Sequence, residues 1–124
     1  MPKLSIIVPC YYNEENLPVT FAEMLKRESE FPQDLELEYV FVDEGSGDDT
    51  LGALMKIRAQ RPEQVKVIKL AKNVGSYNAI LAGMNYATGD CTTVLTADLQ
   101  DPPEIIPQMY DYWTKGLKLV IANR

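Results

Sequence analysis

The sequence contains no histidine, only two cysteines and no excess of basic residues. The absence of histidine removes the commonest general base and the commonest zinc ligand. Cys10 and Cys91 lie far apart in strand-like segments, which favours buried, reduced thiols in a cytosolic protein over a disulfide framework. The formal net charge of −6 argues against a nucleic-acid backbone or an anionic membrane surface as the partner of this segment.

Long apolar runs, internal repeats and low-complexity tracts are missing as well. No apolar run approaches the length of a membrane span. The 124 residues, 46% of them hydrophobic, are enough for one domain with its own core.

Four short apolar segments predict β-strands, and each is followed by a polar turn and a helical pattern. They are residues 4–8, 37–42, 65–70 and 92–95. This repeat is typical of an α/β fold with a mainly parallel sheet, helices on both faces and right-handed crossovers. The helix predicted for residues 77–87 is apolar on most sides, so we expect it to be the most buried helix. Residues 117–122 predict a fifth strand, and its position at the end of the sequence indicates part of a longer protein.

Polar residues gather in the turns after the predicted strands, at residues 11–15, 43–46, 72–76 and 98–100. Because the carboxyl ends of parallel strands meet at one edge of a sheet, these turns should lie together where α/β sheets bind ligands. Carboxylates can bind base N–H groups or ribose hydroxyls, and a lysine can bind phosphates. Asp98 and Gln100 offer oxygen ligands that suit Mg²⁺ or Mn²⁺ already held by a diphosphate. The alternative is that acidic turns only cap helices, but Asp43, Glu44 and Asp98 lie outside the predicted capping positions.

These segments resemble family 2 glycosyltransferases of the GT-A fold, in particular the bacterial and dolichyl-phosphate sugar synthases that load a sugar onto a polyprenyl phosphate. The matching segments stand in family order and spacing: SIIVPCYYNEENLP, VFVDEGSGDDT, KNVGSYNAILAGMNYATGD and TADLQDPPE. The resemblance implies a three-layer α/β/α GT-A (Rossmann-like) domain with a mainly parallel central sheet, truncated after about the fifth strand. Residues 1–124 are then one nucleotide-sugar-binding domain from a longer, membrane-associated protein.

The resemblance also implies site residues. The positions that match nucleotide-binding residues are Pro9, Tyr11, Glu14, Asp43, Glu44, Ser46, Lys72, Gly75 and Asp98. Asp98 and Gln100 match the residues that hold the divalent metal, Mg²⁺ or Mn²⁺. Asp98 is a metal-holding acid, and no catalytic base is named, because the acceptor-side carboxylate of such enzymes follows the segment present here.

The function that the resemblance implies is that of a donor domain. It binds a nucleotide-diphosphate sugar with a divalent metal for inverting transfer to an acceptor, a polyprenyl phosphate that docks on the part following Arg124. The segment itself is expected in the cytoplasm and the parent protein at the cytoplasmic face of the membrane. We expect the segment alone to bind nucleotide without transferring sugar.

Three positions depart from the family pattern. Glu44 replaces the second aspartate of the acidic pair, and Thr96 replaces the first aspartate of the metal motif and removes a charge. Tyr12 is inserted in the first turn, so either Asn13 and Glu14 or the unshifted positions fill the family's roles. Thr96 keeps open the alternative of a catalytically inactive nucleotide-sugar-binding or interaction module. A receiver-type signalling domain is disfavoured, because its acids follow the first and third strands rather than the second and fourth.

Overall fold

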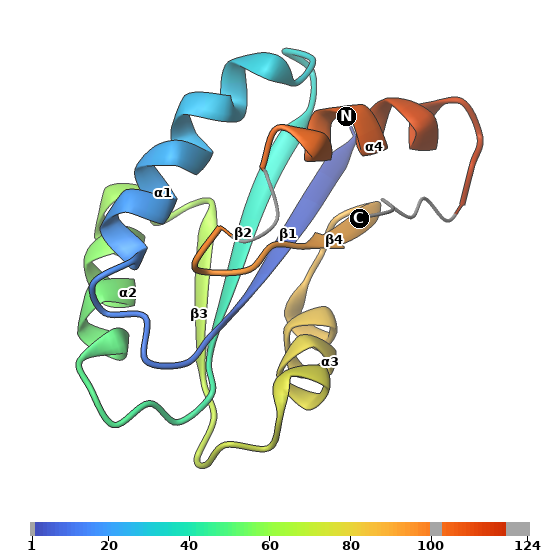
Figure 1. The fold of residues 1–124 in the computed structure, drawn as a ribbon. Helices are drawn as coiled ribbons and strands as arrows, with labels where there is room; N and C mark the ends of the chain where they lie inside the picture. Colours follow the sequence, from blue (N-terminus) through green and yellow to red (C-terminus); the bar gives the residue numbers. More distant parts are fainter. Residues whose placement is uncertain (1, 100–102, 119–124) are drawn as a thin grey trace.

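The described residues form a four-stranded parallel sheet with helices on both faces (Figure 1). The computed structural model describes residues 2–99 and 103–118. The strands are β1 (Lys3–Cys10), β2 (Glu36–Asp43), β3 (Val65–Lys69) and β4 (Cys91–Val94). The helices are α1 (Leu17–Lys26), the 3₁₀ turn η1 (Arg27–Glu30), α2 (Thr50–Gln60), α3 (Ser76–Tyr86) and α4 (Ile105–Thr114). The predicted α/β/α class is confirmed. The fifth strand predicted for residues 117–122 falls largely on residues 119–124, outside the described residues.

The sheet has the strand order β3-β2-β1-β4, so β1 is central. All three pairings are parallel: Cys10 lies beside Asp43 on β2, and Ile7 lies beside Val94 on β4. From β1 the chain adds β2 and then β3 on one side, and β4 then pairs with the other side of β1. The direction in which strands are added therefore reverses at β1. In open α/β sheets, ligands bind beyond the carboxyl ends of the strands at such a reversal.

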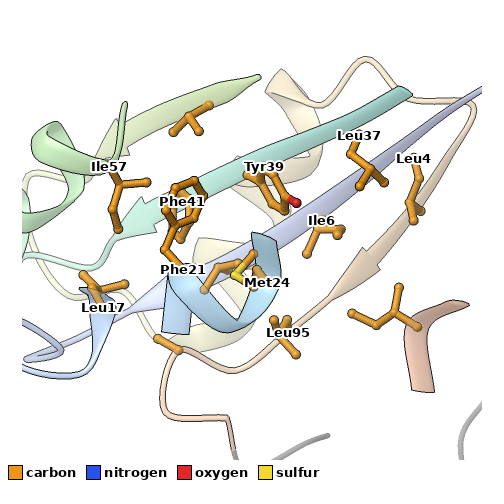
Figure 2. Packing of buried hydrophobic residues seen from close by; sticks show 14 of the residues in the cluster. Leu4, Ile6, Leu17, Phe21, Met24, Leu37, Tyr39, Phe41, Ile57 and Leu95 are labelled. Atoms are coloured by element: carbon orange, nitrogen blue, oxygen red, sulfur yellow. The ribbon is translucent and has the colours of Figure 1, made fainter. Parts of the chain in front are cut away.

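The larger core fills the space between the sheet and helices α1, α2 and α4. Phe21 of α1 packs edge-on against Tyr39 and Phe41 of β2, with ring centroids 5.7 and 6.2 Å apart (Figure 2). Leu17 and Leu54, from α1 and α2, have no exposed surface. Burial of apolar side chains is the main favourable contribution to folding, and here it packs α1 and α2, which follow the first two turns, against the sheet.

Helix α3 packs on the opposite face of the sheet, and it is not the most buried helix as the sequence had predicted. It buries only the small residues Ala79 and Gly83, and Ala79 belongs to the small core on this face. Tyr77 and Leu81 are 86% and 57% exposed. The reason is geometric: a helix on a sheet presents one stripe to it, so the apolar residues outside that stripe remain uncovered by the described residues.

A buried carboxylate joins the strands near their amino ends. Glu38 of β2 is 4% exposed and accepts a hydrogen bond from Ser5 Oγ at 2.8 Å. It also forms ion pairs with Lys3 at 3.4 Å and Lys66 at 3.0 Å, which lie on the two neighbouring strands. The sequence analysis did not single out Glu38. It lies five residues before Asp43, toward the edge of the sheet away from the turns described next.

Candidate functional site

Four turns leave the carboxyl edge of the sheet. They are residues 11–16, 44–49, 70–75 and 95–104, the last of which includes residues 100–102 outside the description. The first three are joined where they leave the strands. The Glu44 N–H donates to the Cys10 carbonyl, and the Leu70 N–H donates to the Asp43 carbonyl, both at 2.9 Å. The prediction that these turns share one edge is confirmed, so Asp43 and Asp98 follow the same edge of the sheet.

The acidic pair after β2 is buried. Asp43 is 2% exposed and Glu44 is 5% exposed. Asp43 Oδ1 accepts a hydrogen bond from the Ser46 N–H at 3.0 Å, which shapes the turn. Burial raises the pKa of the Glu44 carboxyl, and the charge of Asp43 raises it further. The two carboxyl groups offer hydrogen-bond acceptors side by side at the end of β2.

Cys10 is the last residue of β1 and lies next to this acidic pair. Its thiol is fully buried and donates to the Val8 carbonyl at 3.4 Å. Burial raises the pKa of the Cys10 thiol well above its ordinary value, and the neighbouring charges of Asp43 and Glu44 add to this. A thiol of this kind stays protonated and is no nucleophile. Cys10 therefore has a packing role.

The first turn absorbs its extra residue as a left-handed bulge. Tyr12 has φ +54° and donates its N–H to Ser46 Oγ at 3.0 Å. Asn13 follows, and its side chain accepts the Tyr11 N–H at 2.7 Å while its own N–H donates to Thr50 Oγ1 at 3.0 Å. The rings of Tyr11 and Tyr12 are edge-to-face at 4.6 Å. The sequence analysis gave Tyr12 no role, although the extra residue was itself the signal.

Glu14 is a predicted nucleotide-binding residue whose carboxylate already has a partner. It accepts the N–H of Asp49, the N-cap residue of α2, at 2.9 Å. The neighbouring Asp48 accepts hydrogen bonds from both the N–H and the hydroxyl of Thr50. The hydrogen bond from the Thr50 hydroxyl is the main cause that lowers the pKa of Asp48. In the structure Glu14 and Asp48 thus satisfy donors at the N-cap and the first residue of α2.

The turn after β2 touches the turn after β3 at Gly45. Gly45 has φ +83°, and a Cβ there would lie 3.0 Å from the Lys72 carbonyl carbon and 3.1 Å from the Asn73 nitrogen. Only a glycine fits both this backbone conformation and this close approach. The contact brings Lys72 beside the acidic turn, where its side chain is exposed. Gly75 follows, and its N–H donates to Asn73 Oδ1 at 2.8 Å.

The turn after β4 is tied to α1. The Thr20 hydroxyl donates to the Ala97 carbonyl, and Ala97 is buried. Asp98 is the exposed residue that follows, and Leu99 closes the turn with φ +59°. Gln100, the second predicted metal ligand, lies outside the described residues. On the β1 side, Pro9 is half-buried beside Val42.

The donor set in the described residues fits a metal shared with a ligand rather than a metal held by protein alone. No group of three or more His, Cys, Asp or Glu within residues 2–99 and 103–118 could hold a metal ion. Mg²⁺ characteristically uses one or two carboxylates together with substrate phosphates. Exposed Asp98 would supply one such carboxylate. With a diphosphate present, the residues fit that arrangement.

Sequence comparison matches residues 5–124 to the family model described as glycosyl transferase family 2. An uncharacterised glycosyltransferase of Synechocystis is 39% identical over 122 residues, which cover 98% of this chain and 37% of that protein. A prophage bactoprenol glucosyl transferase homologue of Escherichia coli is 34% identical, with 98% and 39% covered. An undecaprenyl-phosphate 4-deoxy-4-formamido-L-arabinose transferase of Photorhabdus laumondii is 35% identical, with 98% and 37% covered. The chain therefore spans about two fifths of the length of these relatives.

Solved structures show the same fold. A mannosyltransferase of Pyrobaculum calidifontis, in complex with GDP-Man and Mn²⁺, is 25% identical with a TM-score of 0.64, covering 82% of this chain and 33% of that one. TarS of S. aureus, in complex with UDP-GlcNAc, is 28% identical with a TM-score of 0.63, covering 87% and 32%. Both similar structures hold nucleotide sugars, and one holds a divalent metal.

Proposed function

The chain belongs to glycosyl transferase family 2, and on that premise we propose that it is the donor-binding part of a glycosyltransferase. It binds a nucleotide-diphosphate sugar together with Mg²⁺ or Mn²⁺, for inverting transfer to an acceptor. The observation that carries the proposal is the buried pair Asp43 and Glu44 at the carboxyl edge, in contact through Gly45 with the turn that bears Lys72.

The roles follow from charge and position. Asp43 and Glu44 bind the base and ribose, whose N–H groups and hydroxyls need acceptors of the kind that these two carboxyl groups offer. Lys72 binds phosphate. Asp98 would hold the divalent ion together with the diphosphate, and the ion would supply the positive charge that offsets their repulsion and that of the leaving group. Pro9, Tyr11, Ser46 and Gly75 line the same edge.

The acceptor is proposed from the relatives. Two of them are named for bactoprenol or undecaprenyl phosphate, so we assign a polyprenyl phosphate to the whole protein, acting at the cytoplasmic face of the membrane. No helix in the described part of the chain has the length and apolar character to cross a bilayer. An ionised phosphate acceptor can attack without a general base, and no such base is assigned in this chain. Because transfer depends on bringing acceptor and donor together, the 124-residue chain binds donor and transfers no sugar.

Titration of the chain with UDP and GDP tests this function. Binding in Mn²⁺ should weaken on the order of tenfold when EDTA is added, and Asp98→Asn should reproduce that loss. Asp43→Asn keeps an oxygen for the Ser46 N–H, so the free energy of unfolding should change by less than ~1 kcal/mol while nucleotide binding falls. Asp111→Asn, in an exposed ion pair with Lys115, is the matched control and should change neither.

Each part can fail separately. Binding that ignores both EDTA and Asp98→Asn would reject the metal. Equal losses of stability and binding in Asp43→Asn would support the capping interpretation of that turn. Sugar transfer to a polyprenyl phosphate by the chain alone would contradict the donor-part assignment. Donor binding without any transfer in the full-length protein would favour an inactive binding module, the alternative suggested by Thr96.

A further inference from the structure

Thr20 is a polar residue on the buried face of α1. The other residues that α1 buries are apolar: Leu17, Phe21 and Met24. Thr20 is 2% exposed, and its hydroxyl donates to the carbonyl of Ala97, which lies seventy-seven positions later in the sequence. A threonine inside a helix can bond the carbonyl four residues earlier, but this hydroxyl bonds the turn after β4. Packing alone would favour an apolar residue at this place, so the hydroxyl is there for the contact with that turn.

The turn that accepts this hydrogen bond carries Asp98. Ala97 directly precedes Asp98 and is 4% exposed, so the hydrogen bond is buried. Before it, the Leu95 N–H donates to a carbonyl of β1 at 2.9 Å. After it, Leu99 has φ +59° and donates its N–H to the Thr96 carbonyl at 3.1 Å. A left-handed leucine is strained and persists only where its surroundings hold it. Asp98 is thus the exposed residue of a turn that is held from both β1 and α1.

We propose that Thr20 is a positioning residue for the metal: it fixes the backbone beside Asp98, the carboxylate that we assign to the divalent ion. This inference rests on the proposed function. An exposed carboxylate on a turn takes its position from the backbone that carries it, and Mg²⁺ demands near-ideal placement of its oxygen ligands. The Thr20 hydroxyl joins that backbone to a helix whose Leu17 and Phe21 belong to the larger core. Groups that support a metal ligand in this way affect metal affinity without touching the ion.

The test measures the dissociation constant of UDP or GDP, whichever the wild-type chain binds more tightly, in Mn²⁺ and in EDTA. The ratio of the two constants is the gain in affinity from the metal. Thr20→Val keeps the shape of the side chain without the hydroxyl, and it should lower this gain about three- to tenfold. Binding in EDTA should change by less than about twofold.

Conservative replacements of Thr20 grade the same effect. Thr20→Ser keeps the hydroxyl and should retain the gain from the metal. Thr20→Cys has a weaker donor and should give an intermediate gain, so it carries the test should Thr20→Val fail to fold. Added to Asp98→Asn, Thr20→Val should lower the gain no further, because both changes act on the same ligand.

Two variants elsewhere separate positioning from stability. Ile57→Val removes a buried methylene group on α2, and it should lower the melting temperature while leaving the gain from the metal intact. Thr114→Val is the matched control, since it removes a hydroxyl that donates to the Asp111 carbonyl at 2.6 Å at the exposed end of α4. It should change neither quantity.

The outcomes distinguish this inference from the proposed function. An unchanged gain in Thr20→Val, or equal weakening of binding in Mn²⁺ and in EDTA, would show that the hydroxyl only stabilises the fold. Either result would overturn the inference while the proposed function stands. Loss of the gain in Ile57→Val would overturn it as well, because any destabilised chain would then bind the metal poorly. Wild-type binding that is the same in Mn²⁺ and in EDTA would overturn both this inference and the metal of the proposed function.

Discussion

Both carboxylate oxygens of Glu38 accept hydrogen bonds from Thr88, which lies fifty positions later in the sequence. The N–H and the hydroxyl of Thr88 each donate at 2.9 Å. Ser5 links the same carboxylate to Gly89, because its hydroxyl donates to Glu38 and accepts the Gly89 N–H at 2.9 Å. Lys66 forms an ion pair with Glu38 and donates to the Tyr86 carbonyl at 2.8 Å. The loop that leads from α3 into β4 is thus tied to three strands through one buried carboxylate.

Replacement of Glu38 by glutamine should destabilise the fold by ~2–3 kcal/mol, because the charge that Lys3 and Lys66 pair with is lost and one acceptor becomes a donor. Urea unfolding measures the change. Glu23→Gln removes a half-buried ion pair with Arg27, which lies one helical turn further along the chain, and should cost no more than ~0.5 kcal/mol. Comparable losses in the two variants would mean that the Glu38 network contributes no more than this single ion pair between neighbouring turns.

Stability should also fall in acid through the same residue. Burial raises the pKa of Glu38, but the hydrogen bonds from the Thr88 N–H, Lys66, Ser5 and the Thr88 hydroxyl outweigh it and lower the pKa from 4.5 to about 2. A carboxylate with a depressed pKa stabilises the folded state above pH 4.5, and this stabilisation is lost as the pH falls toward 2. The loss from this group should be about 3 kcal/mol. Unfolding free energies at pH 6, 4 and 2.5 measure it, and Glu38→Gln should show a flatter dependence on pH. An identical pH dependence in the variant would assign the acid sensitivity to other carboxylates.

The contact between the turns after β2 and β3 can be tested with two glycines. Gly75→Ala should cost ~1–3 kcal/mol through its positive φ alone, because nothing lies within 4 Å of the new Cβ. Gly45→Ala should cost a further ~1–3 kcal/mol, because its Cβ also meets the backbone of Lys72 and Asn73. Thermal unfolding of both variants gives the comparison. Equal costs would indicate that the two turns separate easily and that Lys72 is not held beside the acidic pair.

The sequence was sufficient for the layer order, the parallel sheet and the shared edge of the turns. These features depend on local periodicity and on the handedness of crossovers, and both operate over one strand-helix unit at a time. The strands and α3 were accordingly located to within two residues. The approximate position of Asp43, directly after an apolar strand, followed from the same local pattern.

Other features required the tertiary structure. Helix α3 is apolar on nearly all sides. Such a pattern does not show how much of the helix surface neighbouring elements cover. Likewise, Glu14 sits in a motif that implies nucleotide binding, but its carboxylate meets the N–H of Asp49 only because α1 and α2 lie side by side.

Long-range contacts also decided the roles of Tyr12 and Glu38. Tyr12 fits over Gly47, thirty-five positions later, and Glu38 bonds to Thr88, fifty positions later. Sequence periodicity indicates only structure within one strand-helix unit. Neither of these two contacts can be predicted from it, because each forms when separate units pack into one sheet. The sequence by itself determined which units form and in what order they join, whereas the tertiary structure decided which side chains meet across them.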